Sequence, residues 1–216
     1  MKQQGGQQRE LIALVADDDI RATIVSILRR PESLGIRPID VDWSDVPVHP
    51  GHDPGCLLRS HEILRAFQHE YAHALVVLDH HGCGQETEPP LILEKRIEDH
   101  LQLSGWEGRC AAVVIEPELE AWIWSDSPHV ERCLGWVGRQ ASLRKWLEEK
   151  NLWPRRAPKP SDPETALRAT LFEVRKTASA KTYQDLSACV SLVHCSDRAF
   201  IRFKTILQNW FPPNKK

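Results

Sequence analysis

Three short apolar runs stand out in the pattern of hydrophobic and polar positions. They are Leu11–Ala16 (LIALVA), Ala74–Leu78 (ALVVL) and Arg109–Ile115 (RCAAVVI). Each is rich in Ala, Val, Leu and Ile and ends at acidic residues, which is the pattern of a strand buried on both faces. A fourth segment, Arg37–Trp43 (RPIDVDW), alternates polar and apolar residues and predicts a half-buried or edge strand.

Helical patterns separate these runs. Isoleucines at helical spacing follow Asp17–Asp19, one of which can cap a helix that continues to about Arg30. Two further helices are expected over Leu57–Tyr71 and Leu91–Leu103. The alternation predicts an α/β fold, with a small, mostly parallel sheet of about four strands flanked by helices and joined by right-handed crossovers.

No convincing strand follows Ser127. Four helices are expected in this half, over Arg139–Lys150, Asp162–Lys176, Thr182–Val193 and Asp197–Trp210. The proline-rich stretch Pro154–Pro163 predicts a linker or an exposed loop. The chain therefore divides into a polar, disordered tail (residues 1–10), an α/β domain (11–131) and a basic, tryptophan-rich helical subdomain (132–216).

The net charge of −2 conceals a strong asymmetry. Residues 132–216 contain 17 Lys and Arg against 7 Asp and Glu, whereas residues 1–131 contain 11 against 23. This predicts either a polyanion-binding surface on the second half or attraction between the halves. For binding to nucleic acid, which would be non-specific and salt-dependent, the candidate residues are Arg155, Arg156, Lys159, Arg175, Lys176, Lys181, Arg202 and Lys204.

The remaining composition indicates a cytoplasmic protein. No apolar run is long enough to cross a bilayer and the first residues are polar, so no membrane association is expected. The six cysteines include no CxxC pair and are expected to be reduced thiols. Most of the eight tryptophans lie in the second half or at its border, where packing in a core or interface is the default expectation.

Acidic residues follow three of the predicted strands. Asp17–Asp19 follow the strand Leu11–Ala16, and Asp79 leads the Asp-His-His sequence after the strand Ala74–Leu78. Glu116, Glu118 and Glu120 follow the strand Arg109–Ile115. Because parallel strands end at the same edge of a sheet, these carboxylates are expected to converge and to need a divalent cation. Oxygen ligands favour Mg²⁺ or Mn²⁺, and His80 or His81 would shift the preference towards Mn²⁺ or a heavier metal. Taken singly, each acid could be a helix cap or an ordinary loop residue.

Two literal motifs carry other interpretations. His69–His73 matches HExxH, the zinc protease signature, but His73 leads directly into a predicted strand, so the two imidazoles would not share a helix face. Asp79-His80-His81 resembles the signature of the DHH phosphoesterases, which use manganese to hydrolyse phosphodiesters. The glycine- and histidine-rich carboxyl-terminal motif of that family is missing.

A broader resemblance is to TOPRIM-like proteins. ALVADDD matches their first acidic position, with Asp17 in place of the usual glutamate, and LDHHG matches their DxD motif, with Asp79 retained and His81 in place of the second aspartate. IEPELEAWIWSD (115–126) is similar to a segment of TOPRIM-like families found near bacterial defence loci. Together with LDHHGCGQE and the stretch Leu186–Phe211, it resembles a protein of methylation-associated anti-phage defence systems.

This resemblance implies a metal-dependent nuclease or phosphodiesterase that acts on nucleic acid with other defence-system proteins. In that interpretation Asp79 is catalytic and Asp17 or Asp18 is the general base; the implied metal ligands are Asp79, His81, Glu116, Glu118 and Glu120. Asp17 has a shorter reach than glutamate, and His81 removes a negative charge. A catalytically degenerate TOPRIM-like binding or assembly module is therefore the alternative, and a DHH-type phosphoesterase is a further one.

Overall fold

Three parallel strands form the centre of the molecule. The structure, a computed structural model, describes residues 8–124, 128–190 and 195–214. Its sheet has the order β1 (Arg9–Val15), β2 (Tyr71–Asp79), β3 (Cys110–Ile115). All three strands are nearly continuous runs of buried aliphatic residues, as expected for a parallel sheet covered on both faces. The α/β class and the parallel sheet are confirmed.

The expected fourth strand is absent from the described residues. Arg37–Asp42 has no regular structure, and Trp43–Asp45 forms one short 3₁₀ turn, η1. Pro38 has no amide to donate, and the Asp40 amide donates to the Glu10 side chain at 2.9 Å instead of to a strand. The prediction of about four strands was wrong at this position, because alternation over a few residues does not require a pairing partner.

The tail predicted over residues 1–10 overlaps the first strand. β1 begins at Arg9, whose amide donates to the Glu70 carbonyl at 2.8 Å, so Arg9 and Glu10 belong to the sheet. Residues 1–7 lie outside the described part of the chain. On the edge of β1 that faces away from β2, Val15 forms an isolated parallel bridge with Val48.

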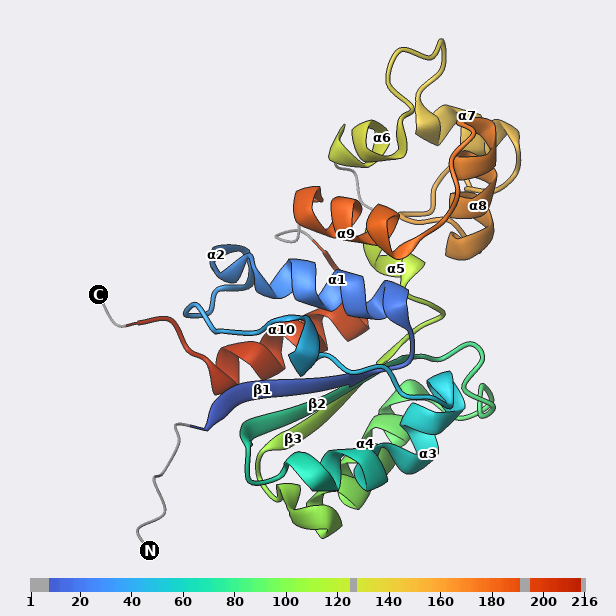
Figure 1. The fold of residues 1–216 in the computed structure, drawn as a ribbon. Coiled ribbons are helices and arrows are strands. Elements are labelled where there is room, and N and C mark those ends of the chain that lie inside the picture. Colours follow the sequence, from blue (N-terminus) through green and yellow to red (C-terminus); the bar gives the residue numbers. More distant parts are fainter. Residues whose placement is uncertain (1–7, 125–127, 191–194, 215–216) are drawn as a thin grey trace, which may run out of the picture.

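Helices cover both faces of the sheet (Figure 1). On one face lie α1 (Asp18–Leu28), α2 (Pro31–Leu34) and α10 (Arg198–Trp210). On the other lie α3 (His52–Leu64), with its 3₁₀ extension η2 (Arg65–Phe67), and α4 (Pro90–Leu101), which continues into the irregular turn η3 (Gln102–Trp106). The helix predicted over 57–71 begins earlier than expected, at His52, and ends earlier, at Leu64, before β2 begins at Tyr71.

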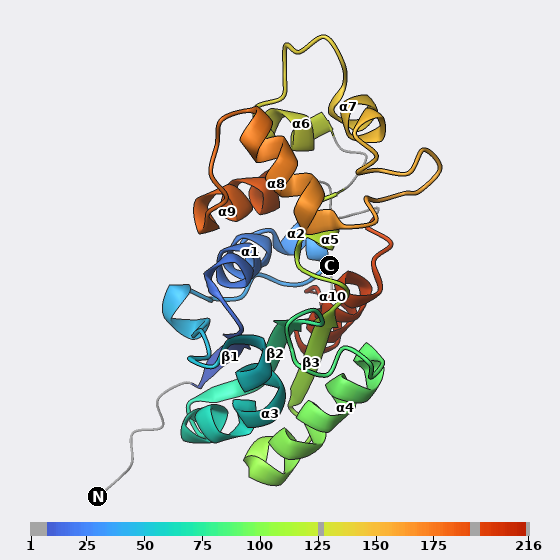
Figure 2. The same cartoon turned by 90° about the vertical axis from the view of Figure 1, so that its right-hand side faces the viewer.

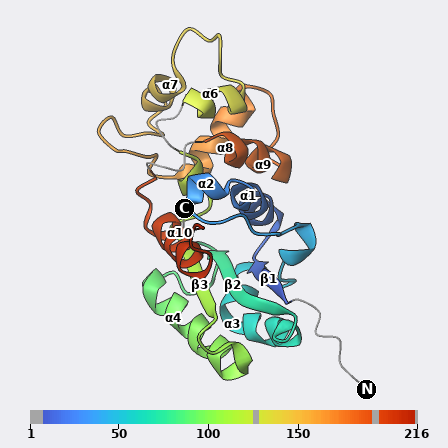
Figure 3. The ribbon, with the colours of Figure 1, turned by 90° about the vertical axis from the view of Figure 1, so that its left-hand side faces the viewer.

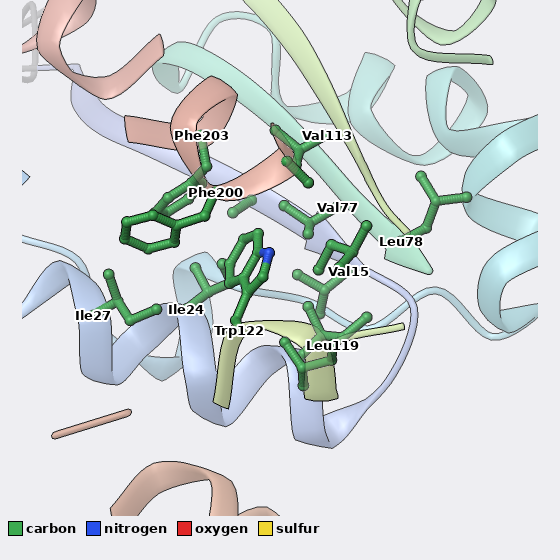
Figure 4. Packing of buried hydrophobic residues seen from close by; sticks show 14 of the residues in the cluster. Val15, Ile24, Ile27, Val77, Leu78, Val113, Leu119, Trp122, Phe200 and Phe203 are labelled. Atoms are coloured by element: carbon green, nitrogen blue, oxygen red, sulfur yellow. The ribbon is translucent and has the colours of Figure 1, made fainter. Parts of the chain in front are cut away.

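Trp122 is a central residue of the layer between α1, α10 and the sheet. It belongs to the short helix α5 (Glu120–Ile123) and is 5% exposed. Its ring centroid lies 5.3 Å from that of Phe200, and Figure 4 shows it beside Ile24 as well. The indole Nε1 donates to Asp197 at 3.0 Å, which satisfies its polar atom. Core packing, the default expectation for the tryptophans, is confirmed for this residue.

The free edge of β3 is covered by side chains. Glu94 and Glu98 of α4 accept from the amides of Val114 and Ala112, at 3.0 and 2.9 Å. Arg198 and Arg202 of α10 donate to the carbonyls of the same two residues, both at 2.8 Å. The arginines also pair with the glutamates, and these ion pairs join the basic half of the chain to the acidic half.

The other helices form a lobe next to α1 (Figures 2 and 3). It comprises α6 (Pro128–Leu134), α7 (Leu143–Glu149), α8 (Pro163–Glu173) and α9 (Ala180–Cys189). α9 packs along α1, α6 packs on α9, and α8 contacts α5. Within residues 132–216, both α9 and α10 thus pack against the α/β part. Within the described ranges, no helix combines the length and apolar character that spanning a membrane requires.

Candidate active site

The strand register brings Asp17 and Asp79 to the same edge of the sheet. Val15 is paired with Val77, so Asp17, two residues later, lies next to the end of β2 at Asp79. Asp79 is in turn paired with Ile115, after which the third acidic segment begins. Asp17 also caps α1, because its Oδ1 accepts from the amides of Asp19 and Ile20 at 2.9 and 2.8 Å. The predicted convergence of the first two acidic segments agrees with this register.

A pocket of about 240 Å³ opens at this edge. Five of the predicted site residues line it, namely Asp17, Asp79, His81, Glu118 and Glu120. The rest of the lining comes from Asp19, Leu119, Glu164, Arg168, Ala178 and Tyr183. The pocket thus holds six carboxylates, and α8 and α9 supply the wall opposite the sheet.

Asp79 occupies the most unfavourable position for a negative charge. Its Oδ1 is buried and has no hydrogen-bond partner. Its amide donates to Oδ1 of Asp53 at 2.8 Å, which places a second carboxylate beside it. Burial, and then the neighbouring charges of Asp53 and Glu120, hold the pKa of the Asp79 carboxyl well above its usual range. Without a cation, the proton is the species that relieves this repulsion.

Two other carboxyl groups in the pocket also bind protons more tightly than usual. Glu120 is 7% exposed and accepts from the Tyr183 hydroxyl, and burial raises the pKa of Glu120 to about 7. Burial together with the charges of Asp17 and Asp18 raises the pKa of Asp19 to about 6. At neutral pH the site therefore contains groups close to their own pKa, which is the condition for proton transfer.

The two histidines after β2 point to different partners. His80 is 8% exposed, and its Nε2 lies 2.9 Å from the carbonyl oxygen of Glu88. His81 is exposed and pairs with Glu118, which raises the pKa of His81. They do not converge with Asp79 on one point, so the geometry gives no support to a DHH-type site.

The HExxH interpretation is excluded by the course of the chain. His73 lies within β2, where it stacks on Trp210 with ring centroids 4.5 Å apart. His69 precedes that strand and belongs to no helix. The two imidazoles therefore do not share a helix face, as the sequence predicted.

Two of the predicted acidic residues lie outside the pocket. Asp18 is exposed and forms an ion pair with Arg21, one turn further along α1. Glu116 is exposed and is not part of the lining. The structure thus separates Asp17 from Asp18, and Glu118 and Glu120 from Glu116. Ser125 and Asp126 of the IEPELEAWIWSD segment lie outside the described residues.

The predicted nucleic-acid contacts fall into two groups. Lys159 and Arg202 are engaged inside the protein, with Ala121 and Asp197 for the lysine and with Ala112 and Glu98 for the arginine. Lys181 pairs with Asp185, and Lys176 donates to the Cys133 carbonyl at 3.2 Å. Of the eight predicted residues, all of them in the described ranges, Arg155, Arg156, Arg175 and Lys204 have side chains that form no hydrogen bond or ion pair.

The pocket meets the requirements of the predicted Mg²⁺ or Mn²⁺ in donor type but not in arrangement. Among the described residues, no group of three or more His, Cys, Asp or Glu side chains has the arrangement of a metal site. The chemistry of the pocket nevertheless fits such a cation, because six carboxylates and the unpartnered Oδ1 of Asp79 are hard oxygen donors. The fit is one of donor type and charge, with side-chain rotation needed to bring the oxygens together.

No protein-family model matches the chain, and no curated protein or solved structure shows significant similarity to it. The function must therefore be inferred from the pocket. Sequence reasoning did not assign Glu164, Arg168 or Tyr183 to the site. Glu164 and Arg168 carry a weak signal, since an acid and a base four residues apart form a helix pair. Nothing in that spacing shows which part of the protein the helix faces.

Proposed function

We propose that this protein is a divalent-cation-dependent phosphodiesterase that acts on nucleic acid. The observation that carries the proposal is Asp79, whose buried and unpartnered Oδ1 lies at the end of the central strand among like charges. A buried carboxylate without a cationic partner costs several kcal/mol unless it is protonated or bound to a cation. A chain that keeps six carboxylates in one pocket is suited to hold a cation there.

The roles of the residues follow from their surroundings. Asp79, Asp17 and Glu118 would hold the cation, Asp17 through the carboxylate oxygen that is not used to cap α1. The cation, when bound, polarises a phosphate oxygen and lowers the pKa of a bound water. Glu120, with a pKa of about 7, is suited to accept the proton of an attacking water at neutral pH.

Tyr183 and Arg168 would complete this chemistry from the opposite wall. The Tyr183 hydroxyl donates to Glu120 and fixes the orientation of that carboxylate. Arg168 is the one lining residue of the described pocket that carries a permanent positive charge. A phosphate group drawn into the pocket would lie between this guanidinium and the acids, so Arg168 would offset part of their repulsion.

The likeness to TOPRIM-like proteins of methylation-associated defence systems supports a role for this activity in defence against phage. In that setting, the cleaved nucleic acid would be that of an invading phage, and other defence-system proteins would be the partners. The short motifs that carry the likeness, LDHHG and EPELEAW, both contribute residues to the pocket.

A second function is binding without cleavage. The observation in its favour is that no three ligands are pre-assembled among the described residues, and that His81, where a TOPRIM-like site has an aspartate, pairs with Glu118. In that case the pocket would bind a cation or a phosphate inside a larger defence assembly.

One assay separates the two. Purified protein is incubated with plasmid and with single-stranded DNA in Mg²⁺ or Mn²⁺, beside Asp79→Asn and the matched control Asp18→Asn. Hydrolysis by the wild type and Asp18→Asn but not by Asp79→Asn is the expected result. Folding of each variant is checked by circular dichroism. Absence of cleavage with either metal by well-folded wild-type protein would refute the catalytic proposal and leave binding as the function.

A further inference from the structure

The helix that forms the far wall of the pocket has an unusual outer surface. α8 begins against the α/β part, where Trp124 Nε1 donates to the Pro163 carbonyl at 2.9 Å. It passes the pocket at Glu164 and Arg168 and then runs outward into the lobe (Figure 2). Phe172, four residues after Arg168, lies on the same face of α8, and the helix ends one residue later, at Glu173.

Phe172 is an exposed aromatic ring. It is 85% exposed, whereas Phe200, Phe203 and Phe211 are each at most 1% exposed. Trp43, another exposed aromatic residue, is covered by the guanidinium of Arg21 at 4.5 Å, but the ring of Phe172 has no aromatic or cationic partner among the described residues. One face of this ring is therefore free to stack on a ligand.

Two basic residues follow Phe172 at the end of the helix. Phe172, Glu173, Arg175 and Lys176 line a shallow hollow on this surface. Arg175 has φ +58°, in the left-handed region where a helix end usually has glycine, and its side chain has no charge partner in the described structure. Placing an arginine there strains the backbone without a compensating hydrogen bond or ion pair from its side chain in the described structure.

We infer that Arg168, Phe172, Arg175 and Lys176 form a binding track for single-stranded nucleic acid that leads into the acidic pocket. The helical rise places Phe172 about 6 Å beyond Arg168, and Arg175 lies past the end of the helix, around the same hollow as Phe172. The step from Arg168 to Phe172 corresponds to about two nucleotides of a stacked strand at about 3.4 Å each. A base would stack on Phe172, its flanking phosphates would contact the arginines, and the next phosphate would enter the pocket. This inference rests on the proposed function, whose substrate class it names.

The basic residues of the track guide a polyanion, and the exposed ring of Phe172 favours a single strand. Six carboxylates repel any polyanion, so a strand can approach only along a line of positive charge, which the track provides. Stacking on an exposed ring requires a base that is not already stacked in a duplex. A protein partner that covered Phe172 would need apolar contact but not an aromatic ring, and this difference can be measured.

The test is fluorescence anisotropy with labelled oligothymidylate and oligouridylate and with a DNA duplex. It uses full-length protein in chelator, so that no cleavage occurs. Phe172→Leu is expected to weaken single-strand binding by about 5- to 100-fold, the loss of one stacked base, whereas Phe172→Tyr retains it. Arg175→Gln is expected to reduce the slope of log affinity against log salt by about 0.7, the value for one phosphate contact. The DNA and RNA arms identify which strand the track prefers.

Matched controls lie on the other face of the sheet. Leu103 is 88% exposed in η3, and Arg65 is exposed in η2, so Leu103→Ala and Arg65→Gln should leave binding unchanged. Equal affinity of Phe172→Leu and wild type, or equal binding of duplex and single strand, would overturn the track. Because the assay needs no cleavage, the track can stand if the protein proves inactive, and it can fail while metal-dependent cleavage is observed.

Discussion

Glu94 and Asp79 both have carboxylate oxygens buried beside the sheet, but their surroundings are opposite. Glu94 has no exposed surface and lies against Arg198 and Arg202, with a backbone amide as a third donor. Asp79 lies against Asp53, Glu120 and other acids, and one of its oxygens has no donor at all. The first is a complete ion-pair network, and the second is a charge that the protein alone does not neutralise.

The difference separates structural burial of charge from functional burial. The Glu94 network closes the edge of β3, so its charges contribute to the fold whether or not a ligand is bound. The ionised Asp79 carboxyl, by contrast, lies buried among like charges and destabilises the folded state. Mutations and pH should therefore change the two regions in opposite directions, and four experiments test this contrast.

The largest effect is expected at Glu94. Glu94→Gln leaves Arg198 and Arg202 without their buried counter-charge and should lower the free energy of unfolding by about 3 kcal/mol. Urea denaturation measures the loss. Asp99→Asn is the control on the same helix, since Asp99 is half exposed and pairs only with Lys95, a contact worth about 0.5 kcal/mol at most. Similar losses in both variants would show that the Glu94 network is no stronger than a surface pair.

The next effect is the pH dependence that Glu120 gives to the free energy of unfolding. Its carboxyl has a folded pKa of about 7 against an ordinary value of 4.5, so the folded state holds a proton that the unfolded state releases. Stability from this group is therefore present at low pH and is lost as pH rises from about 4.5 to about 7, a change of about 3 kcal/mol.

The difference in unfolding free energy between wild type and Glu120→Gln isolates this contribution. In chelator, wild type should lose stability relative to the variant between pH 5 and pH 8, and Mg²⁺ or Mn²⁺ should restore it most strongly at the higher pH, where protons compete least. A difference that stays constant with pH would contradict the raised pKa of Glu120.

A smaller effect of opposite sign is expected at Asp79. Asp79→Asn removes a carboxyl that must either take up a proton or repel its neighbours when the protein folds, and should raise the free energy of unfolding in chelator by about 1 kcal/mol. The same substitution should abolish cleavage and the stabilisation by divalent cations. Thermal unfolding with and without Mn²⁺ measures both. A destabilised variant that still gains stability from Mn²⁺ would show that Asp79 does not hold the cation.

The smallest effect is expected at Asp18. This residue is exposed and paired with Arg21 outside the pocket, so Asp18→Asn should change stability by less than about 0.5 kcal/mol and leave cleavage unchanged. Cleavage rates at saturating metal provide the comparison. A large loss of activity in this variant would restore Asp18 as the general base that the sequence allowed.

The sequence was sufficient for the parts of the fold that are determined locally. The apolar runs at Leu11, Ala74 and Arg109 predicted three buried strands, and parallel pairing then placed Asp17 beside Asp79. The strand expected over Arg37–Trp43 failed because its alternation is a local pattern, whereas pairing depends on a partner strand.

The remainder of the site depends on tertiary packing that no local pattern records. Arg202 is one of several arginines in a basic half, and its role at the edge of β3 requires knowing that α10 returns to the sheet. Tyr183 reaches the pocket because α9 packs along α1. These two helices are far apart in the sequence, since Ser26 and Gln184, which form a hydrogen bond between them, are 158 residues apart. Net charge identified a basic half but could not separate its internal ion pairs from its exposed residues.

The origin of the pocket walls has a consequence for synthesis of the chain. The acids of the sheet edge lie before residue 121, whereas Glu164, Arg168 and Tyr183 come from helices made later. A nascent chain that has left the ribosome only as far as α5 has the acidic edge open to water, without the wall or the track. Because contacts between distant segments form late in folding, the pocket is complete only after α8 and α9 have docked, and under the proposed function a partly made chain would lack the wall and the track that guide nucleic acid to the acids.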